Sequence, residues 1–358
     1  MLIIDGIIFT LQRAGGISVI FRELLDYLDK ENIPTTHLID GSPLQDLPNY
    51  QAGVRTISRS ARFSERYRSC TMPSYGSKST FNFGSKLFHS SYYRIPTNKD
   101  VTNIVTVHDF MYERFRHGPA KWVHTIQKKA AIDRAQAIIC VSKSTLSDLN
   151  EFVSVRRDQI VEVIHPGVSE YFYPMNQAVA ISEFRERPYI LFVGQRGGYK
   201  NFNLALATLS ELPEFELRCV GGGDFRRNEF DGASQELVSR VRHMGFTSNK
   251  ELNLLYNQAS CLFYPSSYEG FGIPVIEAMK AGCPVVSTNC KAIVEIGGDA
   301  LQIVPVHDPI ELAKAVLNTV SHDRKTIIKK GILNAEKYSW ARSNLQILNV
   351  YKRLGLFA

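Results

Sequence analysis

Several features that would assign a protein to a membrane, secreted or metal-binding class are missing from this sequence. Its 358 residues contain no apolar run near the ~20 residues needed to cross a bilayer. The first residues, Met1 to Asp5, have neither the basic start nor the cleavage site of a signal peptide. Six cysteines stand singly, at positions 70, 140, 219, 261, 283 and 290, so no zinc site or disulfide scaffold is indicated. We expect a cytoplasmic globular protein with about two domains.

Acidic residues are nearly absent from residues 55–99. Nine basic residues and one acid, Glu65, give this segment a charge of +8, whereas the whole chain carries +7. Aromatic residues are interleaved, so the segment is suited to phosphate, nucleic acid or anionic lipid, with a solvated basic loop as the alternative. Within it, Ser58 to Tyr67 is predicted to form a short basic amphipathic helix. The basic residues are Arg55, Arg59, Arg62, Arg66, Arg68, Lys78, Lys86, Arg94 and Lys99.

The stretch 261–287 organises the rest of the chain. Its apolar start, Cys261 to Tyr264, predicts a buried strand. Gly270 and Gly272 then leave backbone N–H groups uncovered, and Pro274 fits the first turn of a helix. A helix N-terminus with bare amides is a binding site for anions.

Two glutamates accompany this predicted anion site, Glu269 in the loop and Glu277 inside the helix. Carboxylates accept hydrogen bonds from sugar hydroxyls, so the combination suggests a nucleotide sugar. For the glutamates alone, a loop glutamate and a surface helix glutamate in another α/β protein is an equal alternative. With Gly-Phe-Gly between them, however, they resemble the paired-glutamate (E-x7-E) motif of retaining GT-B glycosyltransferases of family 4.

The resemblance implies a role for each residue of this motif. Glu269 is expected to hold the donor-sugar hydroxyls, and Glu277 the ribose. The backbone amides of Gly270, Phe271, Gly272 and Ile273 are expected to help hold the diphosphate.

Cations are predicted beside the same ligand. A strand over Tyr189 to Val193 leads into a glycine-rich loop that contains Arg196 and Lys200. Arginine can chelate two phosphate oxygens and lysine supplies a point charge, although a basic surface loop is the alternative. Lys200-Asn201 resembles the family's Lys-Asn pair, whereas Tyr199 stands where the family often has arginine. We therefore expect Lys200 to bind the diphosphate, and Arg196 is the second candidate for this role.

In the first half, Leu2 to Ile4 together with Ile7 to Phe9 is predicted to form the first strand, before a Gly15-Gly16 loop and a helix. Glycines at such a turn are often only packing devices. The resemblance implies that the glycine pair lets the donor phosphate approach, and Gly16 is the candidate for this contact.

A β-branched run, Val101 to Val107, predicts another strand that ends at His108. A histidine at the carboxyl end of a strand can hydrogen-bond a sugar hydroxyl or a reacting oxygen, or can simply cap a loop. The sequence Thr-Val-His-Asp-Phe resembles the segment that lies near the reaction centre in this family. His108 is therefore the second catalytic candidate with Glu269, and Asp109 is a weaker one.

Strands alternate with helices in both halves, which predicts α/β parallel sheets covered on both faces. The resemblance implies GT-B architecture, in which two Rossmann-like doubly wound domains face each other across a cleft. We assign residues 1–175 to an acceptor-side domain and residues 176–338 to a nucleotide-sugar domain, with 176–187 as the linker. A last helix, 339–358, is expected to pack back onto the first domain.

The predicted reaction is retaining transfer of a hexose, with mannose from GDP-mannose as the first choice, to a lipid-linked oligosaccharide. The sequence of residues 9–18 resembles the corresponding segment of bacterial enzymes that make O-antigen, capsule or exopolysaccharide. No Asp-x-Asp occurs, so neither a metal nor another cofactor is expected. The basic segment 55–99 would then contact the anionic cytoplasmic face of the inner membrane, where the protein would be peripheral.

Three other functions stay open. A UDP-sugar-dependent transferase of the same pathway would use the same residues. A nucleotide-sugar epimerase would use the same phosphate and ribose contacts without an acceptor. A nucleic-acid-binding protein would use residues 55–99 but has no use for the paired glutamates, so we expect no nucleic-acid partner.

Overall fold

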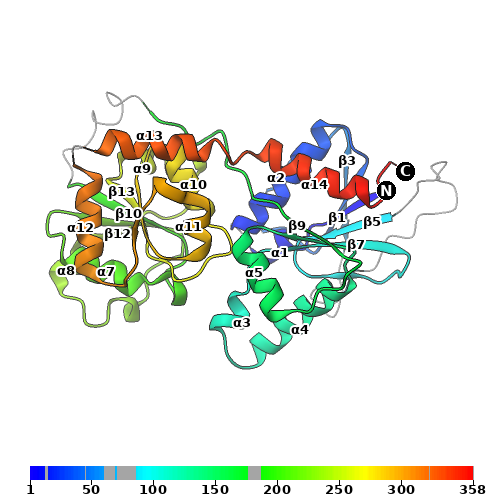
Figure 1. Ribbon diagram of the computed structural model, residues 1–358, viewed down its shortest axis with the longest axis horizontal. Coiled ribbons are helices and arrows are strands. Elements are labelled where there is room, and N and C mark those ends of the chain that lie inside the picture. The colour runs from blue at the N-terminus through cyan, green and yellow to red at the C-terminus, as the bar shows by residue number, and fades with distance from the viewer. Residues whose placement is uncertain are drawn as a thin grey trace. The chain divides into compact units, whose positions relative to one another are not determined.

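The computed structural model describes residues 1–12, 15–44, 46–59, 69–70, 86–175, 187–321 and 323–357. They form two compact units (Figure 1). The first consists of Met1–Gly167 with Trp340–Ala358, and the second of Val168–Ser339. No helix in the described ranges is long and apolar enough to cross a membrane.

The first unit is built on a sheet of seven parallel strands. In order across the sheet the strands are β3 (Val54–Arg59), β2 (Thr35–Asp40), β1 (Leu2–Asp5), β5 (Lys86–Ser90), β7 (Val101–Val107), β8 (Ala137–Cys140) and β9 (Ile160–Val163). The strands β1, β7 and β8 are buried and rich in aliphatic residues, which is typical of a sheet covered on both faces. The prediction of a strand over Val101–Val107 is confirmed. A separate pair joins β4 (Ser69–Cys70) to β6 (Ile95–Pro96).

Helices cover both faces of this sheet. Helices α2 (Gly16–Lys30) and α14 (Trp340–Arg353) lie on one face, and α4 (Pro119–Arg134) and α5 (Lys143–Phe152) lie on the other (Figure 1). Successive side chains of β7 point to opposite faces of the sheet, so this strand contacts the helices on both faces. Val105 and Val107 pack with α4 and α5. The Thr106 hydroxyl lies 2.8 Å from His89 Nε2, and His89 Nδ1 lies 2.5 Å from the Tyr351 hydroxyl of α14. Two short helices, α1 (Ile8–Leu11) and α3 (Met111–Phe115), complete the unit.

The predicted first strand is wrong over Ile7 to Phe9. Strand β1 ends at Asp5, and the chain enters α1 instead. Gly6 explains the turn, because its N–H donates to Leu38 O at 2.7 Å and a Cβ there would collide with His37. The Asp5 carboxylate then accepts a hydrogen bond from Ile7 N at 3.2 Å. An apolar run alone does not distinguish a strand from a helix.

The basic segment differs from its prediction in two ways. Ser58 and Arg59 belong to β3, so the predicted helix is wrong at its start, and residues 60–67 lie outside the described ranges. Arg94 is wholly buried and paired with Asp5 and Asp40, so it is no part of a surface for phosphate or lipid.

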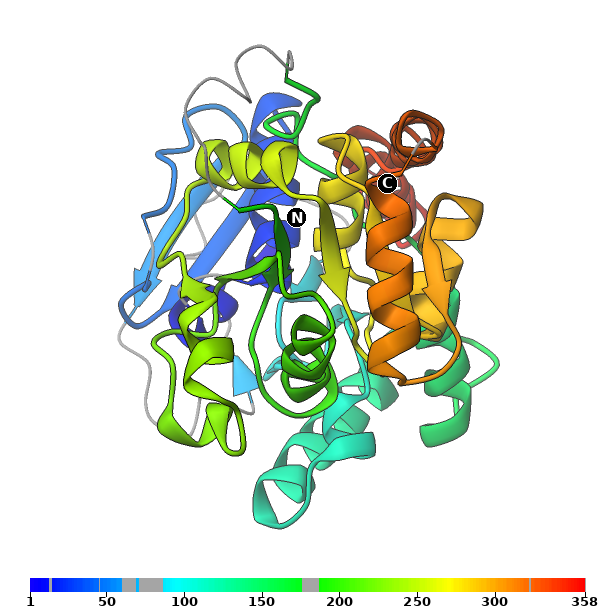
Figure 2. The same ribbon diagram turned by 90° about the vertical axis from the view of Figure 1, so that its left-hand side faces the viewer.

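The second unit is built on a sheet of six parallel strands, so the prediction of parallel α/β sheets is confirmed. Helices α7 and α12 lie on one face of the sheet (Figure 2), and α10 packs against α9, α11 and α13 on the other. The strands are β12 (Val241–His243), β11 (Glu216–Val220), β10 (Tyr189–Val193), β13 (Cys261–Tyr264), β14 (Val285–Thr288) and β15 (Gln302–Val304). The helices are α7 (Phe202–Ser210), α8 (Gln235–Ser239), α9 (Asn249–Gln258), α10 (Ile273–Lys280), α11 (Lys291–Gly297), α12 (Pro309–Thr319) and α13 (Arg324–Ala335), with 3-10 turns η1 (Gly198–Lys200), η2 (Arg227–Phe230) and η3 (Gly298–Ala300).

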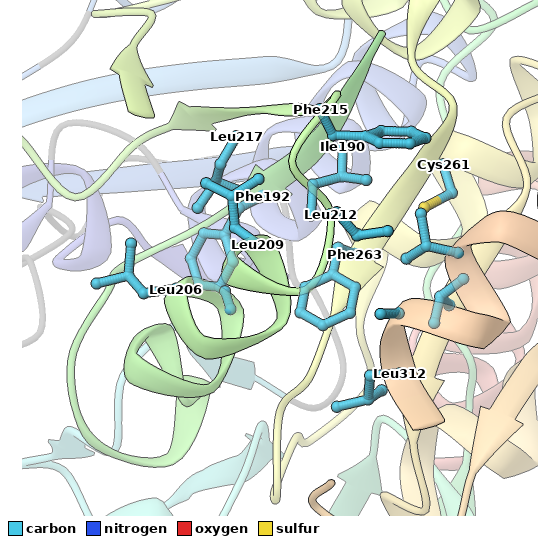
Figure 3. Packing of buried hydrophobic residues seen from close by; sticks show 14 of the residues in the cluster. Ile190, Phe192, Leu206, Leu209, Leu212, Phe215, Leu217, Cys261, Phe263 and Leu312 are labelled. Atoms are coloured by element: carbon cyan, nitrogen blue, oxygen red, sulfur yellow. The ribbon is translucent and has the colours of Figure 1, made fainter. Parts of the chain in front are cut away.

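The core of this unit fixes the ends of its central strands. Ile190 and Phe192 of β10 and Phe263 of β13 pack against α7 and Leu312 of α12 (Figure 3). Burying each such side chain contributes about 1.5–3 kcal/mol. Rigid strands therefore hold the loops that follow Val193 and Tyr264. The cysteines at 140, 219, 261, 283 and 290 are buried free thiols.

The boundary drawn at residue 175 differs from the division seen here. Residues Val168 to Met175 lie with the second unit, because Tyr173 N donates to Asn253 Oδ1 at 3.1 Å and Met175 N donates to Asn257 Oδ1 at 2.7 Å. The linker predicted at 176–187 falls, apart from Arg187, outside the described residues. Helix α14 belongs to the first unit, where it packs against α2.

Candidate functional site

The candidate site of the second unit lies where the strand order of its sheet reverses. Strands β10 and β13 are neighbours, but β10 leads to α7 and β13 leads to α10, on opposite faces. The loops after them, 194–201 and 265–272, therefore diverge. In open α/β sheets ligands bind at such a switch point, outside the carboxyl ends of the strands. Most of the residues singled out from the sequence lie on these two loops.

Lys200 and Glu269 join the two loops. Lys200 Nζ lies 2.5 Å from Glu269 Oε1 and donates to the Tyr264 hydroxyl at 2.8 Å. Both charged side chains are about nine-tenths buried, with exposed fractions of 12% and 10%. The loops are also tied through Asn201, whose amide donates to Pro265 O at 2.8 Å and Ser267 Oγ at 3.0 Å. The structure thus brings a cation and a carboxylate together at one point.

Tyr264 also belongs to this candidate site, although the sequence analysis named it only as the end of an apolar strand. It is the last residue of β13, and that position at the carboxyl end of a strand was the signal available. Burial raises the pKa of Tyr264 well above its usual value, and the nearby Glu269 carboxylate acts in the same direction. The phenol therefore stays protonated and can hold Glu269 while it accepts from Lys200.

Arg196 is engaged by the protein itself. Its guanidinium donates to the carbonyls of Gly221 (2.8 Å), Gly223 (2.7 Å) and Asp224 (3.0 Å). Nε also lies 3.3 Å from a Glu229 carboxylate oxygen, and the side chain is 1% exposed. In this structure Arg196 therefore fastens the glycine turn after β11, and its role at a diphosphate stays a prediction.

The glycine loop after Glu269 delivers a helix N-terminus. Helix α10 begins at Ile273, with Gly272 at φ +110° before it. A Cβ at Gly272 would collide with Ile293, so both the backbone angle and the packing call for glycine. Phe271 is buried with its ring 5.8 Å from Tyr338, which leaves its backbone rather than its side chain for a ligand.

Glu277 lies one turn inside α10 and is half-buried. Burial raises its pKa to about 7, although the Tyr256 hydroxyl, which donates to Oε2 at 3.1 Å, acts to lower it. The carboxyl group is therefore close to its titration point at neutral pH. Tyr256 comes from the last turn of α9, and nothing in its local sequence marked it.

An open cavity of about 440 Å³ adjoins the two loops. None of Lys200, Glu269 or Glu277 lines it, so it is separate from the charged contact. Its lining residues are Arg196, Gly198, Asn201, Phe202, Asn203, Leu204, Ser267 and His307. Among the described residues, no cluster of three or more His, Cys, Asp or Glu side chains is arranged to hold a metal ion.

His108 and Gly16, the other candidates from the sequence, lie in the first unit. His108 directly follows β7 and is only 6% exposed, and its Nε2 has no hydrogen-bond partner among the described residues. Burial lowers the pKa of His108 to about 4, so the ring is neutral at physiological pH. The Asp109 carboxylate accepts from Met111 N at 2.9 Å, at the first residue of α3. Gly16 is the first residue of α2, and the ring of Phe21 on that helix lies 6.2 Å from His108.

Two family profiles match the chain, one in each half. Residues 14–170 match the description "Glycosyltransferase Family 4", and residues 176–332 match "Glycosyl transferases group 1". An O-antigen chain mannosyltransferase B from Escherichia coli is 27% identical over 285 residues, which is 75% of this chain and 74% of the relative. Matches to three further relatives cover 64%, 62% and 58% of their length, so this chain spans less than two thirds of those proteins.

Solved structures show the same fold. Sucrose-phosphate synthase from Thermosynechococcus elongatus superposes with a TM-score of 0.78 at 20% identity, over 99% of this chain and 98% of that one. WaaG, a glycosyltransferase involved in lipopolysaccharide biosynthesis, gives a TM-score of 0.69 at 15% identity, over 98% and 99%. The two family profiles, one for each half of the chain, and the fold of these structures lead to the same family as the motif residues described above. The chain therefore belongs to the family 4 glycosyltransferases of the GT-B fold.

Proposed function

We propose that this glycosyltransferase moves a hexose from a nucleotide diphosphate sugar to a hydroxyl of a lipid-linked oligosaccharide, with retention of configuration. The observation that carries the proposal is the Lys200–Glu269 contact at the switch point of the second sheet. It places a cation for phosphate and a carboxylate for sugar hydroxyls within one hydrogen bond of each other. Helix α10 begins four residues after Glu269, so amides are close by in the chain.

The donor would replace contacts that the protein now makes internally. Its diphosphate takes Lys200 and the amides at Gly270 to Ile273, and its sugar hydroxyls take Glu269. Lys200 then stabilises the negative charge that grows on the departing nucleoside diphosphate. Glu277, once ionised, accepts from the ribose hydroxyls. Gly16 leaves room for the phosphate, because any side chain there would stand at the first turn of α2.

His108 is assigned to the reacting sugar. Its bare, neutral Nε2 suits a hydrogen bond to a sugar hydroxyl better than it suits a charge contact. For the chemical step we favour transfer on one face of the sugar. The acceptor oxygen bonds to the anomeric carbon as the bond to the diphosphate breaks, and the acceptor proton leaves with the diphosphate. We propose that no metal or cofactor takes part.

Mannose and an O-antigen acceptor are supported by the similarity to the O-antigen chain mannosyltransferase, and GDP-mannose is our first choice of donor. A UDP-sugar donor is the second candidate, since the phosphate and ribose contacts described here do not depend on the base. The chain would work as a peripheral protein on the cytoplasmic membrane face, where such acceptors are expected.

The test begins with thermal shifts for GDP, UDP, ADP and their sugar conjugates, because a ligand that binds only the native state raises the melting temperature. Conjugates that shift it are then incubated with and without a lipid-linked acceptor, and the anomeric configuration of the product is read by NMR. Acceptor-dependent transfer with retention supports the proposal. Conversion of the sugar without acceptor would indicate an epimerase, and an inverted product would remove the one-face mechanism.

A further inference from the structure

Between residues 122 and 128, helix α4 presents large apolar side chains to solvent and polar side chains to the protein, whereas Ala131 and Ile132 further along are buried in the core. Trp122, Val123 and Ile126 are 69%, 55% and 57% exposed. His124 and Lys128, by contrast, face inward and are buried. A helix on the surface of a globular protein ordinarily has the reverse pattern. The exposed apolar side therefore calls for an explanation other than packing within this unit.

Specific contacts hold α4 in this orientation. Lys128 Nζ donates to Asp109 O at 2.7 Å and pairs with Glu113 at 2.8 Å, above the ring of Phe110. Although burial acts to raise the pKa of Glu113, the nearby His124 ring and the Lys128 ammonium lower it to about 2, so this ion pair persists at neutral pH. Rotating the helix to cover Trp122 would leave Lys128 and Glu113 unpaired.

Contacts of His124 also hold the inward side of α4 against the protein. Its ring stacks on Tyr112 with centroids 3.9 Å apart, and its Nε2 lies 3.1 Å from the Tyr92 hydroxyl. With Lys128 one turn further along, the inward side of α4 is anchored at two positions. The outward side is thus a stable feature of the fold.

The charge around the apolar residues is mainly positive. Residues 115–130 contain four lysine and arginine residues and no acidic one, and the acid of α4, Asp133, lies 3.7 Å from Arg156. Arg116 and Lys129 are exposed and Lys121 is half-buried, whereas Lys128 is turned inward. An interfacial helix that lies on an anionic bilayer has this composition, with tryptophan and aliphatic side chains beside lysine and arginine. The excess of positive charge favours an anionic lipid surface over a second copy of this chain, which would bring like charges together.

We propose that the outer face of α4, made by Trp122, Val123 and Ile126 with Arg116, Lys121 and Lys129, binds the surface of an anionic lipid bilayer. The helix lies flat in the headgroup region with its apolar side chains inserted. This contact gives the proposed function access to a lipid-linked acceptor, but it rests on α4 alone and needs no substrate. It is a different surface from the basic segment 55–99.

Vesicle binding tests the proposal directly. Trp122 is exposed and the other tryptophan, Trp340, is buried, so a change in fluorescence reports mainly on α4. We expect a blue shift with vesicles of phosphatidylcholine and phosphatidylglycerol, and little change with phosphatidylcholine alone. Co-sedimentation gives the affinity independently. The double variants Trp122→Ser/Ile126→Ser and Lys121→Glu/Lys129→Glu should each weaken it by at least about tenfold, since two apolar anchors or two cations are lost.

Matched variants in the second unit are the controls. Leu333→Ser replaces a side chain with a similar exposure, 53%, and Lys325→Glu/Lys329→Glu makes the same charge change on α13. Both should bind anionic vesicles as the parent does. Equal binding by the α4 variants and the parent overturns the proposal, and so does a parental dimer that Trp122→Ser/Ile126→Ser abolishes without a change in vesicle binding.

A water-soluble acceptor separates this proposal from the proposed function. If Trp122→Ser/Ile126→Ser transfers sugar to it at the parental rate but no longer binds vesicles, both stand. Vesicle binding without any transfer by the parent would remove the proposed function alone.

Discussion

Lys200 and Glu269 form a nearly buried ion pair, with 2.5 Å between Nζ and Oε1, that joins the loops after β10 and β13. The Tyr264 hydroxyl accepts from the same ammonium at 2.8 Å. In the proposed function the donor separates this pair, its phosphate taking Lys200 and its hydroxyls taking Glu269. Replacing each of the two residues should then have different consequences.

Glu269→Gln should leave the fold and nucleotide affinity almost unchanged while transfer falls by at least about 100-fold. The amide is the same size but is uncharged, so it holds the sugar hydroxyls weakly when positive charge develops on the sugar. Calorimetry with the nucleoside diphosphate and a transfer assay measure the two effects. Normal turnover by this variant would remove Glu269 from the site.

Lys200→Met should weaken nucleoside diphosphate binding by about 10- to 100-fold, since a charge-assisted hydrogen bond contributes about 1.5–3 kcal/mol. The uncharged nucleoside serves as the control ligand, and its affinity should change little. The prediction fails if both ligands lose the same factor, because that result would mean a general disturbance of the loop.

Arg196→Lys should lower the melting temperature and weaken the nucleoside and the nucleoside diphosphate alike. Its guanidinium is fastened to carbonyls between Gly221 and Asp224, and one ammonium cannot reach them all. Direct contact with the diphosphate would give another result, in which only the diphosphate binds less tightly and the melting temperature is kept. Comparing the two ligands therefore decides between the observed role and the one expected from the sequence.

Glu277 should make nucleotide-sugar affinity depend on pH near neutrality. Its folded-state pKa of about 7 lies above the ordinary value of 4.5 because of burial, so folding favours the protonated form. That stabilisation is present below pH 4.5 and is lost as the pH rises through 7. The melting temperature without ligand should therefore fall over this range, whereas affinity should rise as the carboxylate forms. Glu277→Gln should flatten both profiles, and unchanged profiles would contradict the assignment.

The motif at 261–287 was predictable because its signals are local. Gly282 has φ +75° after α10, and Pro274 occupies the first turn, so glycine and proline mark the helix within one residue. The β-branched run over Val101–Val107 specified β7 in the same way. Both segments depend on backbone preferences that are read from a few adjacent residues.

The rest depends on partners far away in the chain. Arg196 meets carbonyls 25 to 28 residues later, and Tyr256 reaches Glu277 from another helix, so no local pattern announces either contact. Likewise, Arg94 belonged to a basic segment by sequence but lies in the core, because Asp5 and Asp40 arrive there from β1 and β2. A charge count locates cations in the chain and does not say which of them reach the surface.

The buried Arg94 network gives a prediction about stability. Arg94 Nε donates to Asp5 at 3.0 Å and NH1 to Asp40 at 2.8 Å, and its backbone N donates to Ser90 Oγ at 2.7 Å. Arg94→Met should reduce the free energy of unfolding of the first unit by about 3–5 kcal/mol, because two buried carboxylates lose their cation. Urea titration followed by circular dichroism measures the change.

Arg353→Met is the control for that change. Arg353 pairs with Glu162 in the same unit, but the two side chains are 54% and 39% exposed. Solvent and salt screen such a pair, so its loss should cost about 1 kcal/mol or less. If both substitutions destabilise the first unit equally, burial does not govern the Arg94 network. If Arg94→Met is the milder of the two, the buried network does not depend on its cation.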